Sequence, residues 1–268
     1  MNKAFVETTI LTNVLLKPGT KKESAAAAAL SRYEETLLPV YAIKEWKNGP
    51  LDNYAYVHDK FVQTKSLADT LDAINSINPY FAPYKKSTSW EAFAAAARLS
   101  GNMSQGELPG LDEDRELADR YRLALSSLII RSWRKRRKVA TKTVDDLDCY
   151  TEAQPKIDRD GFFDLKPQKC DNSRECCLAE RLKAGKNTLR AMRDAIPESS
   201  SRQEDRNRRH VLKQLINSPK LPLNEEQCRW LGDAIFAFFC PDDAVVLTTN
   251  LKDHKPLASA IGKDAEAP

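Results

Sequence analysis

The sequence predicts an α/β protein built on a central, mainly parallel sheet. Short apolar runs at residues 3–6 and 244–247 have the length and composition of buried strands. Longer segments between these runs carry apolar residues at helical spacing. Strand-like and helix-like segments alternate at both ends of the chain, and this alternation is typical of a parallel sheet covered by helices.

The N-terminal region predicts a strand, a helix and a second apolar element. The strand of residues 3–6 stops at Glu7, and a polar loop is expected to follow. From Ser24 the segment SAAAAALSRYEETL is rich in strong helix formers, which predicts a helix. The apolar residues 38–43 then lead into Glu45 before a Gly-Pro pair.

The middle of the chain, residues 51–221, predicts mainly helix. Apolar residues at helical spacing predict long amphipathic helices over residues 57–77 and 112–139. Residues 100–111 and 151–169 contain glycine and proline and are expected to be loops.

The C-terminal region, residues 222–262, predicts a helix, a buried strand, a polar loop and a final helix. Asn224 is expected to cap the first of these helices, and the last is expected over residues 256–261. Residues 263–268 are expected to form a tail. In parallel α/β sheets, ligands gather beyond the carboxyl ends of the strands. The ends of the first and last predicted strands therefore point to one site.

Composition excludes several functional classes. The 42 Lys and Arg residues exceed the 38 Asp and Glu residues by only four, which does not by itself indicate a polyanionic partner. No apolar stretch approaches the roughly 20 residues of a membrane span, and Lys3 and Glu7 interrupt the position of a secretory leader. A cytoplasmic protein without membrane contact is expected. Motifs for nucleotide-driven motors, dehydrogenases and triad hydrolases are not found in the sequence.

Acidic and amide side chains follow or flank the predicted core elements. These are Glu7, Glu45, Asp233 and Asp253, with Asn250 beside the last. Charged residues are usually solvated, but Glu7 and Asp233 are embedded among apolar neighbours. Carboxylates about 4 Å apart would repel by about 4 kcal/mol per pair at an effective dielectric constant near 20. Mg²⁺ or Mn²⁺ would remove that repulsion and would support phosphodiester hydrolysis.

Four segments carry a resemblance to a known family: FVETTIL (5–11), PVYAIKEWKNG (39–49), LGDAIFAF (231–238) and VVLTTNLKDHKPLASAIG (245–262). In order and in spacing to the termini, they resemble the four motif regions of PIN-domain nucleases. The resemblance covers residues 1–50 and 222–262. It implies a Rossmann-like α/β/α sandwich with a large helical insertion, an acidic cluster that binds Mg²⁺ or Mn²⁺, and cleavage of RNA. It also implies a toxin or defence setting, with an antitoxin or another protein as a partner.

The resemblance assigns roles to individual residues. The catalytic residues that it implies are Glu7, Glu45, Asp233 and Asp253. The metal ligands that it implies are Glu7, Glu45, Asp233 and Asn250. Thr9 and Thr249 are expected to contact these ligands, and not the metal, and so to orient them.

Two departures from the family pattern keep a second function open. Glu7 is one methylene longer than the usual Asp, and Asn250 cannot supply a negative charge. An active nuclease would have to recover that charge from Asp253 or Asp243. The alternative is a catalytically degenerate PIN-like module that binds nucleic acid or protein. A structure-specific DNA nuclease is a third hypothesis, but no helix-hairpin element for gripping duplex DNA is found in the sequence.

Two basic runs are candidate nucleic-acid contacts. The first run, residues 131–138, contains Trp133 followed by Arg134, Arg136 and Arg137, and residues 202–209 form the second. Such runs can neutralise phosphates while an aromatic ring stacks on a base. The alternative is a solvated helix end. With the predicted nuclease site, the two runs favour RNA, or DNA, as the partner.

Four cysteines could hold a structural Zn²⁺ ion: Cys149, Cys170, Cys176 and Cys177. Their spacing is irregular and paired Cys-x-x-Cys motifs are missing, so thiols without metal are the default interpretation. The sequence also leaves open whether the chain forms a homo-oligomer.

Overall fold

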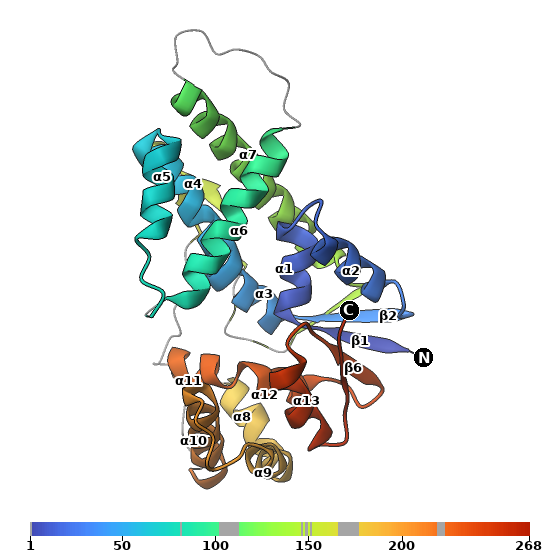
Figure 1. Ribbon diagram of the computed structural model, residues 1–268. Coiled ribbons are helices and arrows are strands. Elements are labelled where there is room, and N and C mark those ends of the chain that lie inside the picture. Colours follow the sequence, from blue (N-terminus) through green and yellow to red (C-terminus); the bar gives the residue numbers. More distant parts are fainter. Residues whose placement is uncertain are drawn as a thin grey trace.

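A parallel sheet organises the chain (Figure 1). The computed structural model describes residues 2–80, 82–101, 113–145, 147, 150, 152–165, 177–218 and 223–268. Within these residues, five strands form the central sheet in the order β3-β2-β1-β6-β7, and every neighbouring pair is parallel. The strands are β1 (Lys3–Val6), β2 (Glu35–Pro39), β3 (Lys142–Val144), β6 (Ala244–Leu247) and β7 (Ala265–Glu266).

Strand β1 lies in the middle of the sheet because its residues can be buried on both faces. Ala4, Phe5 and Val6 are completely buried. Phe5 pairs with Leu37 of β2 on one side and with Val246 of β6 on the other. Continuous apolar runs of this kind are typical of parallel strands covered on both faces. The sequence prediction of two buried strands in one sheet is confirmed.

Helices cover both faces of the sheet (Figure 1). Helices α1 (Thr8–Leu16), α2 (Lys21–Leu30) and α3 (Val40–Trp46) lie on one face. Helices α12 (Gly232–Phe239) and α13 (Leu251–Ser259) lie on the other. The predicted class, α/β with a parallel central sheet, is therefore confirmed.

The middle of the chain is helical, as predicted, but it also contributes to the sheet. Its helices are α4 (Asp52–Thr64), α5 (Leu67–Asn75), α6 (Pro83–Ser100), α7 (Glu113–Lys135), α8 (Cys177–Ala184), α9 (Lys186–Ala195) and α10 (Gln203–Asn217), and α11 (Glu225–Trp230) follows. The short helices η1 (Lys47–Leu51) and η2 (Arg136–Lys138) extend α3 and α7. Strand β3 pairs with β2, while β4 (Lys156–Ile157) and β5 (Phe163–Asp164) form a separate hairpin. None of the described helices is both long enough and apolar enough to cross a bilayer.

Local capping explains why a predicted loop is a helix. The segment after Glu7 was expected to be a polar loop, and that prediction is wrong because α1 begins at Thr8. The Glu7 side chain accepts a hydrogen bond from the backbone N–H of Thr9 and so caps the helix. The predicted helix from Ser24 is also too long, because it ends at Leu30 and Glu35 already belongs to β2.

Two further segments differ from the sequence prediction. The helix predicted over residues 57–77 divides into α4 and α5, because Lys65 adopts a left-handed conformation with φ of 53°. Residues 263–268 were expected to be a tail, but Ala265 and Glu266 form the edge strand β7. A carboxylate oxygen of Glu266 accepts a hydrogen bond from the Tyr33 hydroxyl at 2.7 Å, which ties this end of the chain to the loop before β2.

Removing the central aromatic side chain of the sheet should destabilise the whole fold. Phe5→Ala is expected to lower the free energy of unfolding by about 3–5 kcal/mol, because the ring is fully buried against Phe236. Ile157→Ala serves as the control: this side chain is 42% exposed, so the change should stay within about 0.5 kcal/mol. Urea denaturation measures both. Equal losses would contradict the assignment of β1 to the core.

Candidate active site at the carboxyl edge of the sheet

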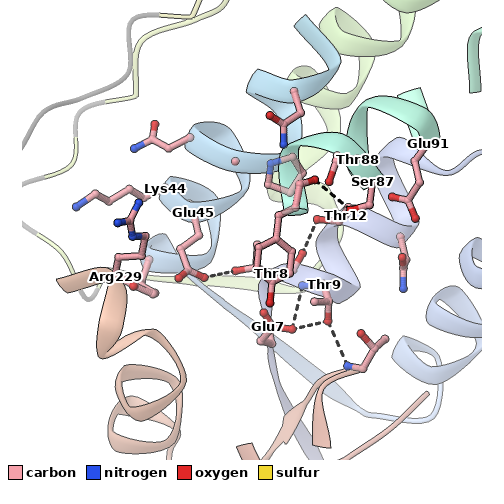
Figure 2. A pocket seen from close by; sticks show the side chains of 18 of the residues that line it. Glu7, Thr8, Thr9, Thr12, Lys44, Glu45, Ser87, Thr88, Glu91 and Arg229 are labelled. Carbon is pink, nitrogen blue, oxygen red and sulfur yellow. Dashed lines mark hydrogen bonds between the residues drawn. The ribbon is translucent and has the colours of Figure 1, made fainter. Parts of the chain in front are cut away.

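A pocket of about 690 Å³ opens where the central strands end (Figure 2). Glu7 comes directly after β1, and Thr249 lies two residues beyond the end of β6. These two strands are neighbours in the sheet. Glu45 reaches the pocket from α3 and Asp233 from α12. Thr9 lines it from the first turn of α1. The structure therefore brings these predicted residues to one pocket, as the strand-end argument requires.

Glu7 is a buried carboxylate held by three hydrogen bonds to one oxygen. Its Oε2 accepts from the Thr9 backbone N–H at 2.9 Å, from the Thr9 hydroxyl, and from the Thr248 hydroxyl at 3.1 Å. The N-terminus of α1 lies at this carboxylate and favours its negative charge. Glu7 is thus fixed in place, and its other oxygen, Oε1, is not used by these three bonds.

Glu45 is a carboxyl group whose ionisation is opposed by its surroundings. Its pKa is raised to about 7 by burial first and then by the negative charges of Glu7 and Asp233, against a 2.7 Å hydrogen bond from the Thr8 hydroxyl that lowers it. Helix α12 can approach this group because residue 232 is glycine. A Cβ atom there would lie 2.9 Å from Glu45 Oε1.

Asp233 has both carboxylate oxygens engaged by basic groups. Its Oδ1 lies 3.1 Å from His254 Nε2, and its Oδ2 forms an ion pair with Arg208 of α10. Burial opposes ionisation of Asp233, but the hydrogen bond from His254 and the charge of Arg208 outweigh it, so the pKa of Asp233 is lowered. Burial also opposes the charged form of His254 and so lowers its pKa. The hydrogen bond to Asp233 and the charges of Asp233, Glu7 and Glu45 outweigh burial, so the pKa of His254 is raised overall.

Asn250 is the N-cap residue of α13 and Asp253 lies in the first turn of that helix, and the two side chains bond to each other. Asn250 Nδ2 donates to Asp253 Oδ2 at 2.8 Å, and Arg202 donates to Asp253 Oδ1 at 2.5 Å. Neither Asn250 nor Asp253 is among the residues that line the pocket. The backbone N–H of Asn250 donates to the Thr248 hydroxyl at 2.9 Å, and Thr248 donates to Glu7. Asn250 is therefore linked to the acidic residues through Thr248.

The acidic residues fit a hard divalent cation only in part. Across the described ranges, no group of three or more His, Cys, Asp or Glu side chains is arranged to hold a metal ion. Asp233 is occupied by Arg208 and His254. Glu7 and Glu45 line the same pocket and interact electrostatically. Mg²⁺ commonly binds through one or two carboxylates and keeps several waters, and this pair matches that requirement.

Several functional side chains were missed by the sequence argument. They are Thr8, Tyr41, Thr248 and His254. Thr8 directly follows Glu7, the acid at the end of β1, and Thr248 directly follows β6. A strand-end argument that included hydroxyl groups could therefore have found both. Arg208 lies in the predicted basic run of residues 202–209, but nothing in that run predicts its ion pair with Asp233, because α10 brings it there from another part of the chain.

Most of the named arginines in the two predicted basic runs form ion pairs with acidic side chains of the same chain. Arg136 and Arg137 both pair with Glu152, and Arg136 lies 3.8 Å above the ring of Trp133, while Arg134 is exposed at the end of α7.

In the second run, Arg202 binds Asp253 and Arg209 binds Glu198.

Of the proposed zinc ligands, Cys177 begins α8, and Cys149, Cys170 and Cys176 lie outside the described residues.

Comparison with family models, with curated proteins and with solved structures finds no match to the chain. The site is therefore interpreted from its own residues. Its features are a strand-end carboxylate fixed by hydroxyl groups, a second carboxyl group with a raised pKa, and a third that is neutralised by basic side chains.

Glu45 should make the stability of the protein depend on pH. Its folded-state pKa of about 7 exceeds the ordinary value of 4.5 for a glutamate side chain, so between these values the folded state binds the extra proton. Stability should therefore fall as pH rises through this window, by up to about 3 kcal/mol. Glu45→Gln should remove this fall, whereas Glu226→Gln, an exposed control on α11, should keep it. Urea denaturation across the window would contradict the assignment if parent and Glu45→Gln proteins gave parallel curves.

Asp233 should matter for stability through its basic partners. Asp233→Asn is expected to cost about 3 kcal/mol, because buried Arg208 loses its closest carboxylate. The double variant Asp233→Asn with Arg208→Met should lose less than the sum of the single variants. Asp243→Asn removes the exposed partner of Lys3 and should cost far less. Additive losses in thermal or urea denaturation would show that the pair is not coupled.

Proposed function

We propose that the protein is a metal-dependent endonuclease with a PIN-like α/β/α sandwich, and that it hydrolyses phosphodiester bonds in RNA. The observation that carries this proposal is the meeting of Glu7, Glu45 and Asp233, from three distant parts of the chain, in one pocket at the carboxyl edge of a parallel sheet. The resemblance of the four motif segments supports the same function. The toxin or defence setting, and an antitoxin partner, rest on that resemblance alone.

The proposed roles follow from the contacts of each side chain. Glu7 and Glu45 would hold Mg²⁺ or Mn²⁺, which when bound supplies a water of lowered pKa and neutralises charge on the phosphate. Thr9 and Thr248 keep Glu7 in one orientation. Thr8 does the same for Glu45. A bound cation would also counteract the burial, and the repulsion from Glu7 and Asp233, that raise the pKa of Glu45.

A catalytically degenerate module that binds nucleic acid or protein is the second candidate. The neutralisation of Asp233 by Arg208 and His254, and of Asp253 by Arg202, favours it. In this function the pocket would keep its shape and lose its need for a cation. Asn250, which carries no charge, is compatible with both candidates.

Cleavage assays test the proposal. The protein is incubated with labelled single-stranded RNA and DNA, with EDTA or with Mn²⁺, and the products are resolved by length. The parent protein should cut RNA only with the cation, and Glu45→Gln should lower the rate by on the order of 100-fold or more. Glu226→Gln, which removes an exposed charge on α11, should cut like the parent. Binding without cleavage under every condition would favour the degenerate module instead.

A further inference from the structure

The pocket extends well beyond its acidic residues, and its other part has different chemistry. Helix α6 supplies Tyr84, Ser87, Thr88 and Glu91 to the pocket wall. In Figure 2, Ser87, Thr88 and Glu91 lie at the top of the pocket and Glu7 at its bottom. The volume of about 690 Å³ falls within the range of small-molecule sites and leaves room beyond the carboxylates for a nucleotide-sized group.

Tyr84 is an exposed aromatic residue at this pocket. Its side chain is 74% exposed, although large aromatic side chains usually contribute to cores or interfaces. It lines the pocket from the first turn of α6. An exposed ring beside a cavity offers a face on which a planar group can stack, and nucleic-acid bases stack on such rings whatever their identity.

The pocket wall also carries amide and hydroxyl groups besides its charged side chains. Asn48, Asn53, Ser87 and Thr88 line it, and the Oδ1 atom of Asn48 is buried with no hydrogen-bond partner in the part of the chain that is described. Amide and hydroxyl groups donate and accept hydrogen bonds at the edges of unpaired bases. This wall can therefore hold a base in the plane that stacking on Tyr84 would set.

Two lysine side chains, Lys17 and Lys22, also line the pocket. Lys17 and Lys22 both pair with the same oxygen of Glu91, at 2.9 Å and 3.4 Å. Two cations thus share one carboxylate, and the Lys22 side chain is largely exposed. The surplus charge can contact a phosphate of a bound strand.

We propose that this part of the pocket is a nucleotide subsite that binds an unpaired base of single-stranded RNA by stacking on Tyr84. The inference rests on the proposed function, because it makes the strand continue from the acidic residues across α6. A base inside a duplex cannot leave its neighbours without an unstacking cost, so the subsite selects single-stranded substrate. Tyr84 then favours single-stranded over duplex RNA and does not distinguish between base sequences.

Binding of fluorescent RNA to the protein tests the subsite separately from cleavage. Anisotropy is measured with Mg²⁺ in a Glu45→Gln background, with a single-stranded oligonucleotide and a duplex of the same sequence. Tyr84→Ala should raise the Kd for the single strand by about 5-fold to 150-fold, which is the range that loss of one base–aromatic stack produces. Tyr84→Phe keeps the ring and should stay within about twofold of the parent. Duplex binding should not respond to Tyr84→Ala.

A matched control is available on the same segment. Tyr80 is 92% exposed and does not line the pocket, so Tyr80→Ala removes an equally accessible ring outside the subsite. It should leave the Kd unchanged. Equal effects of the two alanine variants, an equal loss with Tyr84→Phe, or an unchanged Kd with Tyr84→Ala would overturn the subsite.

The outcomes separate the subsite from the nuclease proposal. If the parent protein never cleaves RNA but Tyr84→Ala still weakens single-strand binding, the subsite stands and the nuclease proposal falls. If Glu45→Gln abolishes cleavage but Tyr84→Ala binds like the parent, the subsite alone falls. If the parent binds no single-stranded RNA, both are overturned.

Discussion

The carboxylate of Glu7 at the end of the central strand is the constraint around which the site is built. It sits where β1 turns directly into α1, so one side chain both caps a helix and places a negative charge at the edge of the sheet. Three donors converge on a single oxygen of this group. One of them, Thr248, follows β6, so the hydrogen bond also joins the two central strands at the point where both end.

The remaining acidic groups are arranged to limit repulsion around that charge. Asp233 is neutralised from two sides, by Arg208 of α10 and by His254 of α13. Burial raises the pKa of Glu45, and so do the negative charges of Glu7 and Asp233, while the hydrogen bond from the Thr8 hydroxyl lowers it. The balance of charge therefore differs between the three carboxyl groups, although they line one pocket. A cation near Glu7 and Glu45 would complete this balance.

The helical middle of the chain has two parts in the site. Helix α10 delivers a basic side chain to the acidic end, and α6 forms the polar and aromatic wall at the other. The segment is thus not a separate appendage, because β3 also joins the sheet from within it. The pocket is lined by residues of α1, α3 and α12 together with residues of α6.

The sequence by itself determined the fold class, the two central strands and three acids of the pocket. Each of these depends on local information: apolar runs of strand length, helical periodicity, and acids next to strand ends. Tertiary structure decided the rest. The segment after Glu7 is helix α1 and not a loop, because the Glu7 side chain caps its first turn. The predicted tail contains β7, because it pairs with the edge of β6. The partners of Asp233 and the wall around Tyr84 come from segments far apart in the chain, and no local pattern records which distant side chains will meet.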